Sequence, residues 1–256
     1  MSDARPARLA QAAQRSAPRA GQGRDEPLTL AIEQSTAEGS VALLCGERVL
    51  GERRWRATRE NTEDLFSVLP GLLSMGKVTL DDVRVYAVGL GPGSYTGLRG
   101  AVAAARAFGL PAGSEVYGVS SGEALAQALA EERDAAAIGI VGDARRGRLW
   151  FALFHGNSGE LAPGATWELT RPDAVAGRVP PGALLATPDW DRLADVLVHH
   201  CGSGNAALIG ERCLPTAAWV GRTVLRRRRR GIRSEPLRPI YLHPPVAGTA
   251  RKDCFS

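Results

Sequence analysis

Short apolar runs and apolar–polar alternation divide the chain into predicted strands and helices. β-branched runs with a period of two predict strands, whereas apolar residues recurring every three to four positions predict helices. In the first half, these patterns predict strands at 28–32, 39–45, 49–56, 83–88 and 115–119, and helices at 61–75 and 97–109. We expect a first lobe of order β-β-β-α-β-α-β that closes near residue 118, with Asn61 as the N-cap of its first helix.

The second half continues with the same mixture of strands and helices. Its patterns predict helices at 124–132, 190–200 and 216–225, and strands at 137–141, 148–154, 167–169 and 184–185. Two successive units that each open with strands and continue into alternating elements indicate a duplicated α/β architecture. We expect the lobes at 28–118 and 119–242, and tails at 1–27 and 243–256.

The most tightly specified stretch is the glycine-rich corner at 89–99, with the sequence GLGPGSYTGLR, between a predicted strand and a predicted helix. Glycine permits positive φ and close backbone approach, and a loop that feeds a helix N-terminus leaves amide groups that could hold an anion. A plain tight connection explains the same glycines, so both interpretations stay open. The spacing is no dinucleotide fingerprint, because the third glycine is missing.

The helix after this corner is apolar on nearly every side. Between residues 98 and 108 the only polar residues are Arg99 and Arg106, seven positions apart and therefore on one narrow stripe. Such a helix must be buried on two sides, either by its own chain or by a partner, and we favour the partner. A strip of small residues would let a second helix approach closely: Gly97, Gly100, Ala101 and Ala104.

Composition indicates a soluble, most simply cytoplasmic protein with no membrane partner. The 256 residues suffice for a sizeable core, no apolar run is as long as a membrane span, and no hydrophobic signal core opens the chain. The four cysteines form no C-x-x-C pair and the four histidines no H-x-x-x-H pair. We therefore expect neither a disulfide framework nor a metal site.

The net charge of +5 is concentrated in two places. Residues 1–27 contain five arginines and almost no aliphatic residues, which predicts a disordered segment: an arginine-rich arm, a transit peptide or a non-native start. The second place is an arginine run at the end of the helix at 216–225. Either it is a solvated helix end that suits the macrodipole, or it contacts phosphates. The run consists of Arg226, Arg227, Arg228, Arg229 and Arg230.

Several of these segments together resemble the TsaB (YeaZ) family. The resemblance covers roughly residues 28 to 245. The segments that carry it are Ile32–Thr36, Ser40–Leu43, Gly91–Arg99, Gly118–Ser121, Asp143–Gly147 and Pro239–Leu242. It implies a two-lobed actin-like, sugar-kinase-like (ASKHA) fold, shared with M22 glycopeptidase-like proteins.

The resemblance also implies a function. Proteins of this family are non-catalytic scaffold and dimerisation subunits for making N6-threonylcarbamoyladenosine beside the anticodon of tRNA. We therefore expect a TsaD-like catalytic subunit and a TsaE-like ATPase as partners, a homodimer as a further state, and tRNA reached through the complex, with the arginine run as a candidate contact. Metal and ATP are expected on the partners, and no cofactor on this chain.

The family's partner interface is a helical bundle formed by the first two helices of the amino-terminal lobe. Here those helices are the predicted 61–75 and 97–109. The candidate interface residues on them are Leu65, Leu69, Leu72, Gly97, Gly100, Ala101, Ala104 and Phe108.

Three departures from the family pattern weaken any catalytic interpretation. Glu33-Gln34 stands where the family has Asp-Thr, Asn61 replaces a histidine, and Arg145 follows Ala144 where a phosphate loop needs glycine. We assign no catalytic and no metal-binding residue. The nucleotide cleft is predicted to be vestigial, with these candidates for residual binding: Glu33, Ser35, Thr36 and Asp143. The alternative functions are an ATP-dependent small-molecule kinase of the same fold and an M22-type glycopeptidase.

Overall fold

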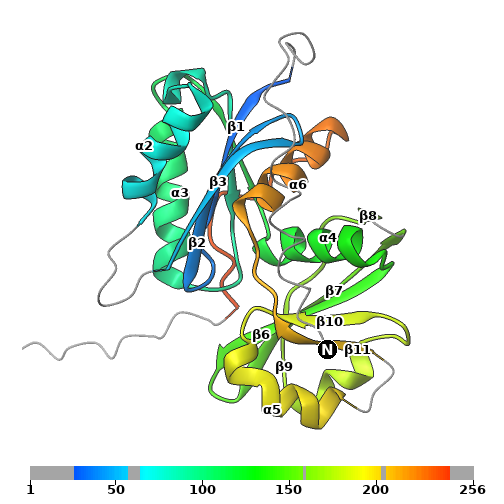
Figure 1. Cartoon of the computed structure of the whole chain (residues 1–256). Coiled ribbons are helices and arrows are strands. Elements are labelled where there is room, and N and C mark those ends of the chain that lie inside the picture. The colour runs from blue at the N-terminus through cyan, green and yellow to red at the C-terminus, as the bar shows by residue number, and fades with distance from the viewer. Residues whose placement is uncertain (1–25, 57–63, 158–159, 203–205, 243–256) are drawn as a thin grey trace, which may run out of the picture.

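A computed structural model describes residues 26–56, 64–157, 160–202 and 206–242. It has two lobes, each built around one β-sheet, with helices on the outer faces and between the sheets (Figure 1). The predicted tails, apart from residues 26 and 27, and the predicted N-cap Asn61 lie outside the described residues.

The first sheet has the strand order β3-β2-β1-β4-β5. Its strands are β1 (Leu28–Glu33), β2 (Glu38–Cys45), β3 (Arg48–Arg56), β4 (Val85–Gly89) and β5 (Glu115–Val119). β1, β2 and β3 form an antiparallel meander, and β4 and β5 continue the sheet parallel to β1. The predicted order β-β-β-α-β-α-β is confirmed, and each of the predicted strands of this lobe is found within two residues of its expected bounds.

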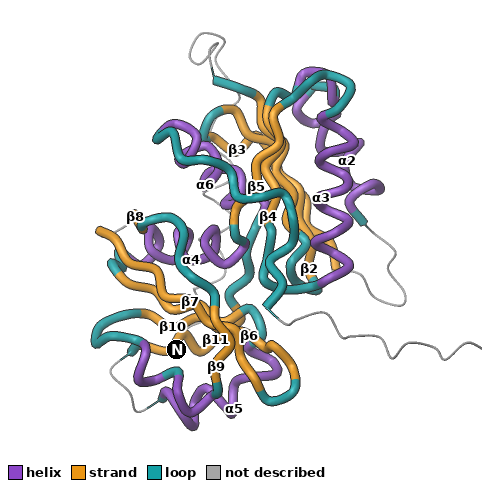
Figure 2. Tube along the Cα trace, turned by 180° about the vertical axis from the view of Figure 1, so that it is seen from behind, coloured by secondary structure: helices purple, strands orange, loops and turns teal. Residues whose placement is uncertain are grey.

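Helices cover both faces of the first sheet. α2 (Leu65–Gly76) and α3 (Tyr95–Gly109) lie on one face and α6 (Ala217–Arg229) on the other (Figures 1 and 2). The period of two along β1 explains this arrangement, because Leu30 and Ile32 pack in the α2–α3 cluster whereas Ala31 packs in the α6 cluster. Small residues on the α6 side allow close approach, and a Cβ on Gly221 would lie 2.7 Å from Leu44 Cδ1.

The position of α6 corrects the predicted lobe boundary. The sequence placed residues 119–242 in the second lobe, but the apolar side chains of α6, Ala217, Val220 and Val224, are buried against the first sheet. The segment that follows α6 also contributes Leu237 and Ile240 to the core on the opposite face of that sheet. The second lobe is therefore an insertion between β5 and α6.

The second sheet has the order β11-β10-β6-β7-β8, with β9 paired to β7. Its strands are β6 (Ala137–Arg145), β7 (Arg148–Asn157), β8 (Glu160–Leu161), β9 (Glu168–Thr170), β10 (Leu184–Thr187) and β11 (Ala207–Arg212). α4 (Ser121–Arg133) covers one face and α5 (Trp190–Cys201) the other. Short 3-10 turns occur at η2 (Leu80–Asp82), η3 (Pro172–Ala174) and η4 (Ala176–Arg178).

The helix ends differ from the predictions in detail. α2 begins at Leu65, and its N-cap is Asp64, whose Oδ1 accepts a hydrogen bond from the Ser67 amide at 2.9 Å. The sequence had placed Asp64 three residues inside the helix. α3 begins at Tyr95, two residues early, because the Ser94 side chain caps it. α6 extends to Arg229, so most of the arginine run is helical.

Ion pairs from the end of α6 connect it to the surrounding elements. Arg227 is buried between α6 and α4, where its guanidinium pairs with the buried Glu123 carboxylate and also contacts Glu235 at 3.1 Å. The other arginines of the run also contact carboxylates: Arg226 with Glu47 and Glu131, Arg228 with Glu115, Arg229 with Glu47 and Arg230 with Glu160. Glu123 and Glu131 lie on α4 and Glu160 lies on β8, so the three ion pairs that these carboxylates form with Arg227, Arg226 and Arg230 join the two lobes.

Breaking the buried pair should cost far more than breaking an exposed one. Arg227→Met would leave Glu123 buried without its cation, and we expect the free energy of unfolding to fall by about 3–5 kcal/mol. Arg228→Met, the matched control on the same helix turn, removes a half-exposed pair with Glu115 and should cost less than about 1 kcal/mol. Urea unfolding of the full chain measures both. Equal losses for the two variants would show that burial of this pair is not what stabilises the α4–α6 contact.

Candidate functional site

A cleft of about 1000 Å³ separates the two lobes. Its first-lobe wall includes the β1–β2 turn and the glycine-rich corner, and its second-lobe wall includes the end of β6. The closing segment of the chain, with Ile240, Tyr241 and Leu242, completes the lining. Three of the predicted nucleotide-site residues therefore do meet here: Ser35, Thr36 and Asp143.

Glu33, the fourth predicted residue, does not line the cleft. Its side chain is fully buried inside the first lobe, where Oε1 accepts a hydrogen bond from the Ser35 amide at 2.5 Å. The carboxylate lies so close to β4 that a Cβ on Gly89 would be 1.9 Å from Oε2. The prediction of Glu33 as a cofactor ligand is therefore wrong: this carboxylate belongs to the core, at the end of β1.

Burial determines the acid–base behaviour of Glu33. Removal from water raises the pKa of its carboxyl above the ordinary value of 4.5. Hydrogen bonding from Ser35 and from the side chain of Ser121 opposes this effect without reversing it. The native protein thus holds the Glu33 proton more tightly than the unfolded chain does.

The polar groups that do reach the cleft are engaged with their neighbours. The Thr36 hydroxyl donates to the Glu38 carbonyl at 2.8 Å and accepts from the Glu38 amide at 3.2 Å. Asp143 accepts from the Arg145 amide at 2.7 Å, and its carboxylate pairs with the guanidinium groups of Arg145 at 3.1 Å and Arg192 at 3.4 Å. A phosphate entering these two turns would compete with existing hydrogen bonds and ion pairs.

One ion pair crosses the cleft from lobe to lobe. Arg212, at the end of β11, lies 3.4 Å from Glu38 of β2 and 3.5 Å from Asp191 of α5. The cleft lining carries as many carboxylates as guanidinium groups: Glu38, Asp143, Asp189 and Asp191 beside Arg56, Arg145, Arg192 and Arg212. Within the described ranges, no three His, Cys, Asp or Glu side chains are arranged to hold a metal ion.

The predicted interface residues on α2 and α3 mostly face the wrong way for a partner. Leucines and alanines of this set are buried in the core of their own lobe: Leu65, Leu69, Leu72, Ala101 and Ala104. Gly97 packs on the β1–β2 turn, where a Cβ would be 2.2 Å from the Gln34 carbonyl oxygen. Phe108 is half-buried, and Gly100 alone of the set is exposed. The buried residues of this set are not free for a partner, because one side of each helix packs against the first sheet.

The side of α3 that faces away from the sheet carries small apolar residues that are exposed. We call this surface the outer helix face, and it comprises Gly100, Ala103 and Ala107 of α3, Leu110 directly after α3, and Phe66 of the neighbouring α2. Its large side chains are well exposed, at 62% for Phe66 and 81% for Leu110, whereas the exposed Met75 of α2 lies over β3, where its sulfur contacts Arg53. An edge-on contact between Phe66 and Phe108, with ring centroids 6.0 Å apart, joins α2 to α3. The sequence carried a signal for this face, since Ala103, Ala107 and Leu110 recur at helical spacing, but the all-round apolar pattern hid which side was free.

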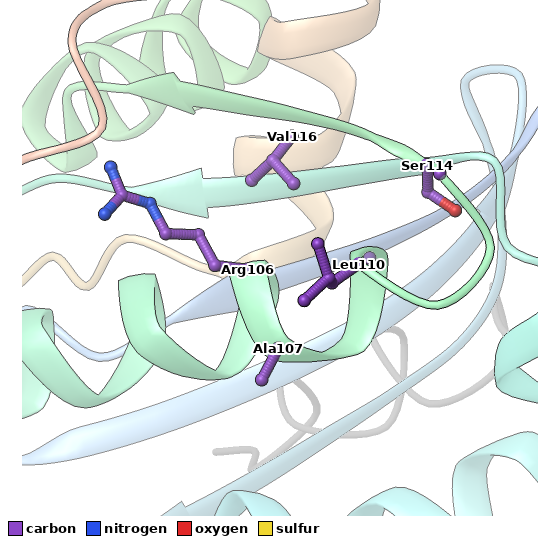
Figure 3. A pocket seen from close by; sticks show the side chains of 7 residues that line it. Arg106, Ala107, Leu110, Ser114 and Val116 are labelled. Carbon is purple, nitrogen blue, oxygen red and sulfur yellow. The ribbon is translucent and has the colours of Figure 1, made fainter.

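A pocket of about 610 Å³ extends the outer helix face past the end of α3 (Figure 3). It is lined by Ala107 of α3, by Leu110 directly after that helix and by Val116 of the edge strand β5, with Ser114 at one end. Arg106 stands at its rim, where the guanidinium donates to the Leu237 carbonyl at 2.9 Å. The apolar surface available beside α3 is therefore larger than the helix alone provides.

The arginine run does not form a free basic patch. Each of Arg226 to Arg230 contacts at least one carboxylate, as described above for the α4–α6 region. The interpretation of the run as a solvated helix end does not hold for all five arginines either, because Arg227 is buried. Contact of this run with tRNA stays a prediction.

Comparison with known proteins identifies the family. A family model described as "TsaD: tRNA N6-adenosine threonylcarbamoyltransferase" matches residues 55–182, half of the chain. The tRNA threonylcarbamoyladenosine biosynthesis protein TsaB of Escherichia coli is 28% identical over 151 residues, which cover 59% of this chain and 65% of that protein. The chain belongs to this family, and within it to the TsaB (YeaZ) proteins.

Two further TsaB (YeaZ) relatives agree with this assignment. TsaB of Haemophilus influenzae is 33% identical over 125 residues, covering 48% of this chain and 52% of that protein. The structure of YeaZ from Pseudomonas aeruginosa superposes with a TM-score of 0.70 at 26% identity, over 84% of this chain and all of the other. The sequence matches thus span about half to two thirds of the curated TsaB proteins. The likeness to YeaZ confirms the predicted two-lobed α/β fold.

The match to the TsaB family is accompanied by one negative finding. None of the helices in the ranges given above combines the length and the apolar character needed to cross a membrane.

The buried Glu33 makes a testable contribution to stability. Above its ordinary pKa of 4.5 the native state binds more protons at this site than the unfolded chain, so wild-type stability falls as the pH rises through the native pKa. Glu33→Gln removes this loss. The stability of the variant relative to wild type should be constant below pH 4.5 and should then grow by up to about 1.4 kcal/mol per pH unit until the native pKa is passed.

Urea unfolding at a series of pH values measures this difference. Glu132→Gln, at an exposed position on α4, is the matched control and should show no such rise. A relative stability of Glu33→Gln that does not change with pH would contradict the assignment of Glu33 as a buried carboxyl with a raised pKa.

Proposed function

We propose that this chain is a non-catalytic scaffold subunit of the machinery that makes N6-threonylcarbamoyladenosine in tRNA, and that it holds a TsaD-like catalytic subunit. Membership of the TsaB (YeaZ) proteins supports this role, because relatives in that group are named for threonylcarbamoyladenosine biosynthesis. The observation that carries the proposal is the outer helix face, an exposed apolar surface on two adjacent helices.

The outer helix face has the composition of a helix-packing surface. Gly100, Ala103 and Ala107 are small, so the axis of a partner helix could approach α3 closely. Phe66 and Leu110 flank them and offer large apolar side chains. Contiguous exposed apolar surface of this kind marks interaction sites in soluble proteins. The proposed occupant is the matching pair of helices of a TsaD-like subunit, and a second copy of this chain is the competing occupant.

The contacts in the cleft suggest which subunit carries the chemistry. In the two turns that would bind phosphate in an actin-like kinase, the Thr36 hydroxyl and the Asp143 carboxylate are already engaged in hydrogen bonds, and Asp143 also in ion pairs. We therefore assign ATP, metal and group transfer to the partner subunits, a TsaD-like enzyme and a TsaE-like ATPase. This chain contributes a rigid surface on which the enzyme folds or is positioned.

Charge on the outer helix face should prevent the complex without unfolding the protein. Ala103→Arg places a long cation at the centre of the exposed face of α3, and we expect affinity for a TsaD-like subunit from the same organism to fall at least tenfold. Val198→Arg, at an exposed apolar position on α5 in the other lobe, is the matched control and should bind normally. Affinity is measured by calorimetry, with melting curves for each variant.

A different result is expected at the neighbouring alanine. Ala104 is buried against the first sheet, so Ala104→Arg should unfold the lobe rather than only block the partner. If Ala103→Arg binds a TsaD-like subunit as wild type does, the outer helix face is not the interface. If it changes only self-association, the face serves the homodimer.

Activity should require the partner. The isolated chain, supplied with tRNA and with the ligase that generates the activated threonylcarbamoyl group, should form no N6-threonylcarbamoyladenosine. Addition of a TsaD-like subunit should restore the product, which nucleoside mass spectrometry detects. Product formation by this chain alone would overturn the scaffold assignment.

A further inference from the structure

Two exposed tyrosines from distant parts of the sequence stack at the mouth of the cleft. Tyr95 opens α3 and Tyr241 lies in the closing segment, and their ring centroids are 5.3 Å apart with planes tilted by 32°. Both line the cleft, yet they are 56% and 52% exposed. Stacking of one ring on the other uses one face of each, so much of the aromatic surface is open to a ligand.

The backbone holds Tyr241 in place. The amide of Ile240 donates to the Leu90 carbonyl at 2.9 Å, and the Ile240 side chain packs on the core of the first lobe. Leu242, on the other side of Tyr241, packs against the second lobe. Tyr241 therefore sits on a segment anchored at both ends, which lowers the entropic cost of binding a ligand to its ring.

Arg99 adds a cation beside the Tyr95 ring, just outside the residues that line the cleft. Its guanidinium donates to the Tyr95 hydroxyl at 2.6 Å and lies 5.2 Å from the centre of the Tyr95 ring. Among the described residues no carboxylate lies within ion-pair distance of Arg99, whereas Arg145, Arg192 and Arg212 of the cleft each have one. An anionic group beside the Tyr95 ring would thus meet a guanidinium that is not paired with any carboxylate among the described residues.

We propose that Tyr241, supported by Tyr95 and flanked by Arg99, is a stacking site for a nucleobase whose phosphate lies near Arg99. A flat aromatic surface beside an uncompensated guanidinium suits a planar ring with an attached anion, and a purine offers the larger ring. The base belongs either to a free nucleotide or to an unpaired nucleotide of an RNA loop. The turn at Thr36 keeps its hydrogen bonds and the turn at Asp143 its ion pairs, so the proposal is for binding and includes no hydrolysis step.

This site goes beyond the proposed scaffold role and is tested without a partner. The full chain is titrated by calorimetry with AMP, adenosine, inorganic phosphate and a short RNA stem-loop that has adenines in its loop. Tyr241→Ala should weaken binding of AMP about tenfold, within the range found for removal of one base–aromatic stack, and Tyr241→Phe, which keeps the ring, should bind as wild type. Arg99→Gln should weaken AMP but leave adenosine unchanged.

The outcomes separate the sources of the base. An equal loss for the stem-loop in Tyr241→Ala assigns the site to RNA, and a loss for AMP alone assigns it to a free nucleotide. Binding of every probe unchanged by Tyr241→Ala, or no binding by the wild-type chain, overturns the proposal. Should Tyr241→Ala fail to fold, the contrast between AMP and adenosine in Arg99→Gln decides.

Discussion

The buried ion pair of Arg227 and Glu123 joins α6 to α4, the two helices that lie between the sheets of the two lobes. α6 covers the inner face of the first sheet and α4 that of the second, and the two helices meet where this pair is buried. Burial raises the pKa of Glu123, and the cation of Arg227 opposes that shift. A buried charge pair is costly to break once formed, because either partner alone would remain desolvated. The lobes are therefore held in one arrangement from the side opposite the outer helix face (Figure 2).

The sequence predicted the strands of the first lobe well because each signal is local. β-branched runs, alternation along β3 and the glycines of the corner depend on neighbouring residues only. α6 was assigned to the wrong lobe because nothing local distinguishes a helix that returns to an earlier sheet. β11 was missed because ALIGER mixes apolar and charged residues without a clear period.

The candidate site was predicted at the level of segments but not of side-chain directions. Ser35, Thr36 and Asp143 do meet across the cleft, as the motif positions indicated. Glu33 precedes the same turn, yet its place in the strand alternation directs it into the core rather than the cleft. On α3 the same difficulty arose, because small apolar residues occupy both the buried and the exposed side. Hydrophobicity alone cannot orient such a helix, and only the sheet beneath it does so.

These constraints together explain why the interaction surface is expected on the outer helix face rather than in the cleft between the lobes. A kinase of actin-like architecture must open and close its cleft, which requires lobes that move and turns that are free to receive phosphate. Here the Arg212–Glu38 pair crosses the cleft, the closing segment packs on both lobes, and the buried pair fixes α4 to α6. Each contact favours the same lobe arrangement, so their effects add. A protein held in this way has a fixed surface, and among the described residues the outer helix face is an exposed apolar part of it.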